Sequence, residues 1–463
     1  MIGKAKYILI LLLAMTIADA SAQISQVLYY MNLPQKHLIN PALRPSNSLY
    51  IGLPVISGIN MKINNNFVNF PDVFMKDQPS DLSYSFLPHD NSGDEFLAKI
   101  KDNNSLESEA TVQLFGLGFS VGKDSYVFLD INDHIDGNIV LPGDLIKFAI
   151  NGNEEFIGSK IDLSSFRGDL KYYREVGLGF SKYLIDKLRI GVKGKMLFGI
   201  ASASVDNRLL ELTINDVDTY TLDADLIVNI SAPVKINIDS DNNIRSFGLD
   251  DSRFDTGKGK RDFFLGKKNI GLGLDIGATY DISDKIVVSA AINDIGFIKW
   301  KKDVTNLHAK SQNEMLDSLK NLNIVDSNDP FTTWLPFGVT LGGSYNLTER
   351  FSLGLLSYSR IIGKQIRKSL TLSANVNIGN TLSTSLSYTV ANHRFDNLGA
   401  GLAFRAGISQ FYILTDRIPL MWDKIKIDSK NTISLPTSWN TFNLRLGMNI
   451  AFGNRIRKNE DNR

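Results

Sequence analysis

The chain has 463 residues, of which 50 are basic and 49 acidic, and its net charge of +1 provides no electrostatic footprint for nucleic acid. It has no cysteine, which excludes a disulfide framework, thiolate catalysis and attachment of a lipid to cysteine. Hydrophobic residues make up 43% of the chain, yet none of its later apolar runs is long enough for a membrane-spanning helix.

The N-terminus has the pattern of a secretory signal peptide. Two lysines precede an apolar run over residues 7–17, and small residues follow it up to Ala20-Ser21-Ala22. The run is shorter than the roughly 20 residues that a spanning helix needs. We therefore expect residues 1–22 to be removed by cleavage after Ala22, and the remaining chain to be exported.

Residues 23–46 come next and contain no sustained alternation of apolar and polar side chains. The motif Asn40-Pro41-Ala42 lies near their end. Because the segment is too long for a simple lead-in to a strand, we expect it to stand apart from the sheet that follows.

Long alternating segments begin at about residue 47. In residues 188–200, aliphatic side chains occupy one parity, while Arg189, Lys193 and Lys195 occupy the other. Since alternate side chains of a strand face opposite sides, one face is apolar and the other cationic. The pattern returns in residues 270–281, 369–378, 382–390 and 442–453. Runs of about ten residues are typical of tilted membrane strands, with the aliphatic parity toward lipid and the Gly, Ser, Thr and Asn parity toward a solvated interior.

Six short turns separate pairs of these strands. Three of them share one form, in which a strand ends on a tyrosine, an acid-base pair makes the turn and an apolar residue begins the return strand. The tyrosines are typical of an interfacial aromatic girdle, although ordinary strand propensity explains any single one. The six turns lie near Gly122-Lys123-Asp124, Asp186-Lys187, Ser283-Asp284, Thr348-Glu349, Gly379-Asn380 and Ala406-Gly407.

Five other connections are long and polar: 63–109, 135–167, 204–268, 302–333 and 417–437. Short turns on one side and long loops on the other are typical of an outer-membrane barrel, whose short turns face the periplasm. We expect fourteen antiparallel strands within residues 47–453, of which the first, from about 47 to 60, pairs with the last to remove open edges. Strand-like segments within 204–240 leave sixteen strands as the alternative to an extracellular hairpin. Residues 141–150 have the spacing of a short helix, and residues 454–463 form a charged tail expected to be disordered.

The Asn40-Pro41-Ala42 motif before a fourteen-strand barrel resembles the FadL-type fold of long-chain fatty-acid transporters, which implies that residues 23–46 form a hatch, or plug, in the lumen. The same motif, with Tyr29-Tyr30-Met31-Asn32 and residues 293–300, 412–416 and 444–453, is also similar to PorP/SprF-like barrels linked with type IX secretion. Over nearly its whole mature length the chain resembles an uncharacterised family of such barrels. No counterpart of a high-affinity fatty-acid pocket is recognisable, so the resemblance concerns the fold more than the cargo.

The sequence contains no catalytic pattern, no metal-ligand spacing and no sign of a cofactor, so we do not expect an enzyme. All five histidines fall in the expected plug or outer loops: His37, His89, His134, His308 and His393. The basic cluster of residues 258–261 fits either contact with anionic lipopolysaccharide or a charged loop offset by nearby aspartates.

Charged side chains on the interior parity are the better candidates, because polar groups inside a barrel set what passes. Those expected to face the lumen are Arg189, Lys193, Lys195, Glu175, Asp275 and Arg445. Salt bridges that merely fill the interior are an equal alternative. The first functional hypothesis is passive transport of a small or hydrophobic solute across the outer membrane, gated by the plug. The second is a scaffold that holds envelope protein partners of a secretion or surface-assembly machine.

Overall fold

The computed structural model describes most of the chain. The residues described are 26–67, 96–217, 219–238, 244–250, 252, 255–266, 268–316, 324–363, 365–391, 394–418, 422–426, 432–436 and 440–453. The expected signal peptide and the expected charged tail lie outside them.

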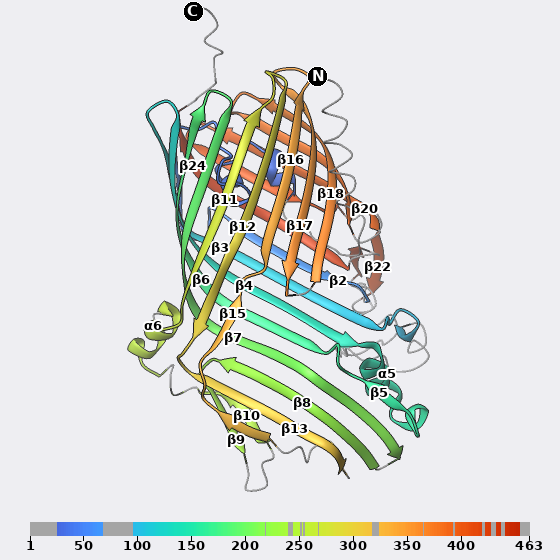
Figure 1. The fold of residues 1–463 in the computed structure, drawn as a ribbon. Coiled ribbons are helices and arrows are strands. Elements are labelled where there is room, and N and C mark those ends of the chain that lie inside the picture. Colours follow the sequence, from blue (N-terminus) through green and yellow to red (C-terminus); the bar gives the residue numbers. More distant parts are fainter. Residues whose placement is uncertain are drawn as a thin grey trace, which may run out of the picture.

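Strands dominate the described residues (Figure 1). The helices are α2 (Gln26–Tyr30), η1 (Pro34–Leu38), α5 (Gly143–Asn151), η2 (Glu154–Phe156) and α6 (Gly257–Leu265). The strands are β1 (Leu49–Gly52), β2 (Ile59–Asn65), β3 (Asn103–Val121), β4 (Ser125–Pro142), β5 (Lys160–Asp162), β6 (Arg167–Ile185), β7 (Leu188–Asp216), β8 (Thr219–Ser231), β9 (Val234–Ile238), β10 (Ile244–Leu249), β11 (Ile270–Asp281), β12 (Ile286–Trp300), β13 (Val304–Leu316), β14 (Ile324–Ser327), β15 (Phe331–Trp334), β16 (Phe337–Asn346), β17 (Phe351–Ile362), β18 (Gln365–Ile378), β19 (Leu382–Ala391), β20 (Arg394–Ala406), β21 (Ser409–Thr415), β22 (Trp422–Lys426), β23 (Thr432–Pro436) and β24 (Thr441–Phe452).

The strands close into an antiparallel barrel of fourteen wall strands, as the sequence predicts. β1 and β2 form one interrupted wall strand, and β15 and β16 form another, because each pair lines up along the same neighbours. The first wall strand pairs with β3 on one side and with the last strand, β24, on the other. Closure gives every wall strand two partners, which removes the open edges that hydrocarbon would penalise.

The two parities of the wall strands face different surroundings. In β11 the exposed fraction is 56% for Leu272 and 46% for Ile276, whereas Asp275 between them is only 1% exposed. The same contrast separates Val192 from Lys193 in β7 and Leu386 from Ser385 in β19. Apolar side chains therefore point outward and polar ones into the lumen, which is the pattern of an outer-membrane barrel.

The six predicted short turns join β3 to β4, β6 to β7, β11 to β12, β16 to β17, β18 to β19 and β20 to β21. They lie together at the upper end of the barrel in Figure 1. Tyr280, Tyr345 and Tyr388, on wall strands joined by these turns, are each 42% exposed. None of the helices among the described residues combines the length and apolar character needed to cross a membrane.

The opposite end of the barrel carries an extension of the sheet, at the lower end in Figure 1. β7 continues to Asp216, pairs with β8 beyond the wall, and β8 pairs with β13. The strand-like segments within 204–240 therefore lie outside the barrel wall. The wall has fourteen strands and not sixteen. The predicted helix near residues 141–150 is α5.

Three expectations about strand ends were wrong. The first wall strand is not continuous from 47 to 60, because Leu53–Gly58 leave the ladder between β1 and β2. Residues 103–109 and 135–142 belong to β3 and β4, although they were expected in loops. Their outward apolar side chains are few, namely Leu106, Ile135 and Ile139, and they lie among polar ones such as Glu107 and Asp136, so the sequence resembles a polar loop.

Candidate functional site

Residues 26–46 lie inside the barrel, and we call them the plug segment. Its apolar side chains, including Val27, Leu28 and Met31, pack against inward-facing Leu356 and Leu414. In Figure 1 the segment is dark blue and lies in the half of the barrel nearer the short turns. It therefore occupies the lumen where the wall crosses the expected membrane.

Polar bonds join the first residues of the plug segment to the wall. The Gln26 side chain donates to Ser369 Oγ at 2.6 Å and accepts from Thr389 Oγ1 at 2.6 Å. The Val27 amide donates to Asp416 Oδ1 at 3.1 Å. The Ser and Thr parity of β18 and β19, which the sequence assigns to the lumen, thus supplies hydrogen-bond partners to the plug segment.

The Asn40-Pro41-Ala42 motif forms the turn at the far end of the plug segment. Asn40 Oδ1 accepts from the Ala42 amide at 2.8 Å, and Asn40 Nδ2 donates to two wall carbonyls at 3.3 Å each. The turn lies directly against two glycines: an added Cβ at Gly277 would be 2.0 Å from Asn40 Oδ1, and one at Gly191 would be 2.3 Å from the Pro41 carbonyl carbon. Only a wall without side chains leaves room for this turn.

His37 makes the one ion pair between the plug segment and the wall in the described part of the chain. Its Nε2 lies 2.7 Å from Asp130 Oδ2 on β4, and its Nδ1 lies 2.6 Å from the Pro34 carbonyl oxygen. The two ring nitrogens thus face a carboxylate of the wall and a carbonyl oxygen of the plug segment itself. The Phe128 ring covers the imidazole, with ring centroids 4.3 Å apart.

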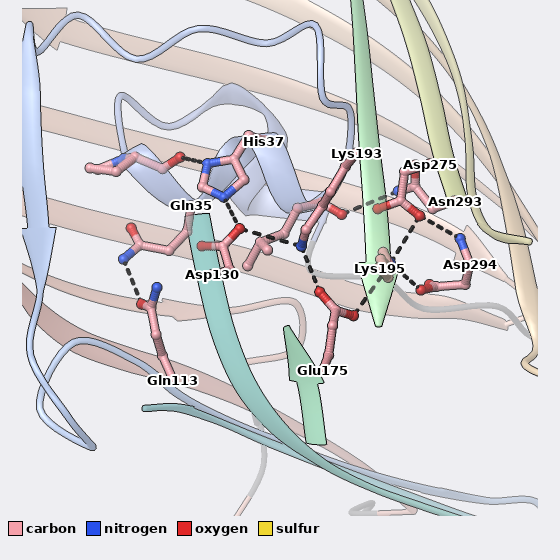
Figure 2. Close-up of polar contacts among 12 residues, drawn as sticks. Gln35, His37, Gln113, Asp130, Glu175, Lys193, Lys195, Asp275, Asn293 and Asp294 are labelled. Atoms are coloured by element: carbon pink, nitrogen blue, oxygen red, sulfur yellow. Dashed lines mark hydrogen bonds and ion pairs between the residues drawn. The ribbon is translucent and has the colours of Figure 1, made fainter. Parts of the chain in front are cut away.

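A chain of buried ion pairs continues from Asp130 across the wall (Figure 2). Lys193 Nζ lies 3.3 Å from Asp130 and 2.6 Å from Glu175, while Lys195 Nζ lies 3.4 Å from Glu175. Lys195 also reaches Asp275 at 2.9 Å and Asp294 at 2.5 Å. Adjacent strands β4, β6, β7, β11 and β12 supply these residues. We call His37, Asp130, Glu175, Lys193, Lys195, Asp275 and Asp294 the lumen network.

Four of the six predicted lumen residues meet in this network: Glu175, Lys193, Lys195 and Asp275. Arg189 lies nearer the short turns, where its guanidinium is 4.3 Å from the centre of the Tyr183 ring. Arg445 lies on β24 and lines the chamber described below. The structure therefore separates Arg189 from the two lysines with which it shares a strand.

Sequence reasoning missed Asp130 and Asp294 and left His37 without a role. Asp130 alternates with outward Leu129 and Ile131, so the parity rule could have identified it. Asp294 lies at an irregularity of the β11–β12 ladder and has a positive φ of 65°, which alternation does not signal. His134 was expected in an outer loop and is instead on β4, 3.6 Å from Glu175.

A chamber of about 120 Å³ lies beside the plug segment, whose Leu38 and Ile39 form part of its lining. Its wall is mostly polar and carries charges of both signs. The basic residues include Lys62, Arg360 and Arg445, and the acidic ones include Glu109, Asp136 and Glu175. A smaller cavity of about 30 Å³ shares Lys62, Glu109 and Arg360 with it. A chamber of this volume and polarity accommodates several waters or a small polar molecule.

The side-chain amide of Asn293 holds the plug segment beside this chamber. Asn293 Nδ2 donates to the Ile39 carbonyl at 2.6 Å and to the Leu38 carbonyl at 3.2 Å. The next residue, Asp294, accepts from Lys195 in the lumen network. The irregularity in β12 thus places a plug contact and a network contact on consecutive residues.

The model of one protein family, described as a family of unknown function (DUF5723), matches residues 41–416. No curated protein matches the chain. Among solved structures, the chain is similar to a Pseudomonas aeruginosa FadL homologue, with 8% identity, a TM-score of 0.46 and coverage of 94% of this chain and 100% of that one. It is also similar to the Ralstonia pickettii toluene transporter TbuX (9% identity, TM-score 0.42, coverage 92% and 98%) and the P. putida toluene transporter TodX (10%, 0.40, 94% and 96%). At these identities the similarity concerns the fold alone.

Proposed function

This chain belongs to the DUF5723 family of unknown function, and we propose that it is an outer-membrane channel that the plug segment closes and that admits a small polar solute. The observation that carries the proposal is the way the plug segment is held. Hydrogen bonds join Gln26, Val27 and Asn40 to the wall, and the part between them meets it through the His37–Asp130 pair and the Asn293 amide, next to a polar chamber. Water can replace such contacts when the segment moves, so closure is reversible.

The lining of the chamber favours a polar solute. A charged or zwitterionic molecule finds partners of both signs there, whereas a hydrophobic one, the other class expected from the sequence, would meet mainly charged and polar side chains. The inward apolar side chains Leu356 and Leu414 are covered by the plug segment's own Val27, Leu28 and Met31. An apolar route would therefore require the plug segment to leave first.

Placement in the outer membrane belongs to the same proposal. It is supported by the outward apolar parity, by exposed Tyr280 and Tyr345 next to the short turns and by the longer connections at the opposite end. On this placement the chamber and the sheet extension face outward, and the short turns face the periplasm. Export by a cleaved signal peptide remains a prediction from the sequence.

An engineered disulfide tests the channel. The chain has no cysteine, and a Cβ at Gly401 would lie 2.5 Å from Val27 Cγ1, so V27C/G401C places two thiols between plug and wall. In liposomes, small zwitterionic solutes such as glycine should enter through the reduced protein and stop entering when it is oxidised. Each single-cysteine variant should be insensitive to oxidation. Equal flux through the oxidised and reduced forms would refute gating by the plug segment.

A scaffold is the second candidate, and the sheet extension favours it. Beyond the wall, β5, β7 and β8 carry a buried apolar cluster that includes Ile161, Leu212 and Leu222, a small core built outside the membrane region. Such a core gives a rigid surface to a protein partner, in keeping with the predicted resemblance to PorP/SprF-like barrels. Extraction in mild detergent should then recover a stoichiometric partner, which a variant lacking residues 205–230 should fail to retain.

A further inference from the structure

The wall near α6 has an outer boundary that the lipid-facing side chains define. In β11 they run from exposed Tyr280 near a short turn to Ile270, which is 46% exposed, and this span of eleven residues matches the length needed to cross the hydrocarbon. Ile270 is the register partner of Phe198 on β7. Nearby, Trp334 is 71% exposed and is the register partner of Phe297, with ring centroids 5.6 Å apart. Aromatic side chains at this level are typical of the interface between hydrocarbon and head groups.

Basic side chains gather immediately beyond this boundary. Lys299 is the register partner of Ile270 and is exposed. Lys268 and Lys301 are brought to the same place by buried Asn269, whose Oδ1 accepts from the Lys301 amide at 2.8 Å and whose backbone oxygen accepts from the Gly199 amide at 2.7 Å. Three exposed lysines, Lys299 on β12 and Lys268 and Lys301 just beyond the outer ends of β11 and β12, thus lie at one level of the outer wall.

Helix α6 adds three more basic residues at this level. It ends at Leu265, and Gly266 then reverses the chain in the left-handed conformation (φ 58°) against Gly199 of the wall. Figure 1 shows the helix on the outside of the barrel. Lys258, Lys260 and Arg261 are exposed on it, and Phe264 is 46% exposed.

The charges of this region are unbalanced. Lys302 pairs with Asp303 at 3.6 Å, and the exposed acids nearest to these cations among the described residues are Asp255 and Asp262 around α6 and Asp329 just before β15. Six exposed basic residues therefore lie among three exposed acids, and no ion pair joins any of the six to an acid in the part of the chain that the structure describes. We call this set the basic rim: Lys258, Lys260, Arg261, Lys268, Lys299 and Lys301.

We propose that the basic rim binds the phosphate groups of an anionic glycolipid in the outer leaflet. Its position just beyond the aromatic boundary is where lipid phosphates lie, and its charge is opposite to theirs. Phe264 and Trp334 supply apolar contact to the upper part of the acyl chains. The inference rests on the outer-membrane placement within the proposed function, and not on solute passage.

Thermal stability in detergent tests this site with the full chain. Bis-phosphorylated lipid A should raise the unfolding temperature of the wild type, whereas dephosphorylated lipid A should not. The rim variant K268Q/K299Q/K301Q should require about tenfold more lipid A for half of the effect. K258Q/K260Q/R261Q should show a similar loss. Inorganic phosphate alone should have no effect, because it lacks the apolar contact.

The matched control neutralises three exposed basic residues at the short turns, K187Q/K285Q/R350Q, and should respond to lipid A like the wild type. An equal response of the wild type to both lipids would overturn the proposal, as would an unchanged lipid A requirement in both rim variants. Equal losses in the rim and control variants would also overturn it, since they would indicate a general charge effect. The test measures lipid binding and not solute flux. Its outcome is therefore independent of whether the protein passes a solute.

Discussion

The imidazole of His37 and the carboxylate of Asp130 lie 2.7 Å apart, and neither side chain is exposed. Asp130 also faces Lys193, so one carboxylate serves the plug segment and the lumen network together. When the plug segment moves away, Asp130 therefore loses His37. The carboxylate then keeps Lys193 as its partner, or water takes the place of His37.

Asp130→Asn should weaken the plug segment's attachment, because it removes the carboxylate that His37 and Lys193 share. Removing one partner of a buried ion pair costs about 3–5 kcal/mol of the free energy of unfolding, which urea titration in detergent micelles measures. Asp144→Asn removes one carboxylate from an exposed pair with Lys147 and should cost under about 1 kcal/mol. Similar losses in both variants would contradict the role given to Asp130.

Asn293→Asp should open the channel. The substitution keeps the size of the side chain but removes the amide donor to the Leu38 and Ile39 carbonyls and places a carboxylate against them. Solute flux into liposomes should rise severalfold. The control is Asn375→Asp, which changes a buried amide on β18 whose hydrogen bonds go to other wall residues. Flux that rises equally in N375D would indicate general loosening of the barrel.

Gly277→Ala should displace the Asn40-Pro41-Ala42 turn, since the new methyl group would lie 2.0 Å from Asn40 Oδ1. Crowding of this kind costs about 1–3 kcal/mol of the free energy of unfolding and should also raise flux. Gly194→Ala is the matched control, because a Cβ there meets nothing within 4 Å. An unchanged flux and stability in G277A would show that the turn does not rest on this strand.

Ile276→Arg tests the lipid-facing parity. Ile276 lies near the middle of the span from Ile270 to Tyr280, where an arginine costs about 2–4 kcal/mol of the free energy of folding into a bilayer. Ile270→Arg, at the outer end of the same parity, should cost only about 0–1 kcal/mol. Folding titrations into lipid vesicles compare the two. Equal costs would contradict the membrane boundaries drawn here.

Lys36 should make stability depend on pH. Burial, with Arg189 nearby as the second cause, lowers the pKa of this plug lysine to about 8 from its ordinary 10.5. Between these values the unfolded chain holds more protons than the folded one, so the free energy of unfolding should rise as the pH increases from 8 toward 10.5. Subtracting the curve for Lys36→Met removes the contribution of other groups. A difference between the two proteins that stays constant with pH would refute the assignment.

The sequence alone determined the strands, the six short turns and the inward position of Lys193, Lys195, Glu175 and Asp275. These follow from the period of two along each strand and from the composition of the turns, both of which are local properties of the backbone. It also placed Asn40-Pro41-Ala42 outside the wall. It did not locate the break at residues 53–58 or the length of β7, because pairing with neighbouring strands decides where a strand breaks or ends.

Only the tertiary structure decided which charges meet. His37 and Asp130 are 93 residues apart in the sequence, and Asn293 and Ile39 are 254 apart. Alternation predicts that a side chain faces the lumen. How deep in the lumen the side chain lies, and which residue it contacts, depend on the register of neighbouring strands and on the path of the plug segment. Both are set by closure of the whole barrel, which is why Arg189 and Lys193, four residues apart on one strand, have different partners.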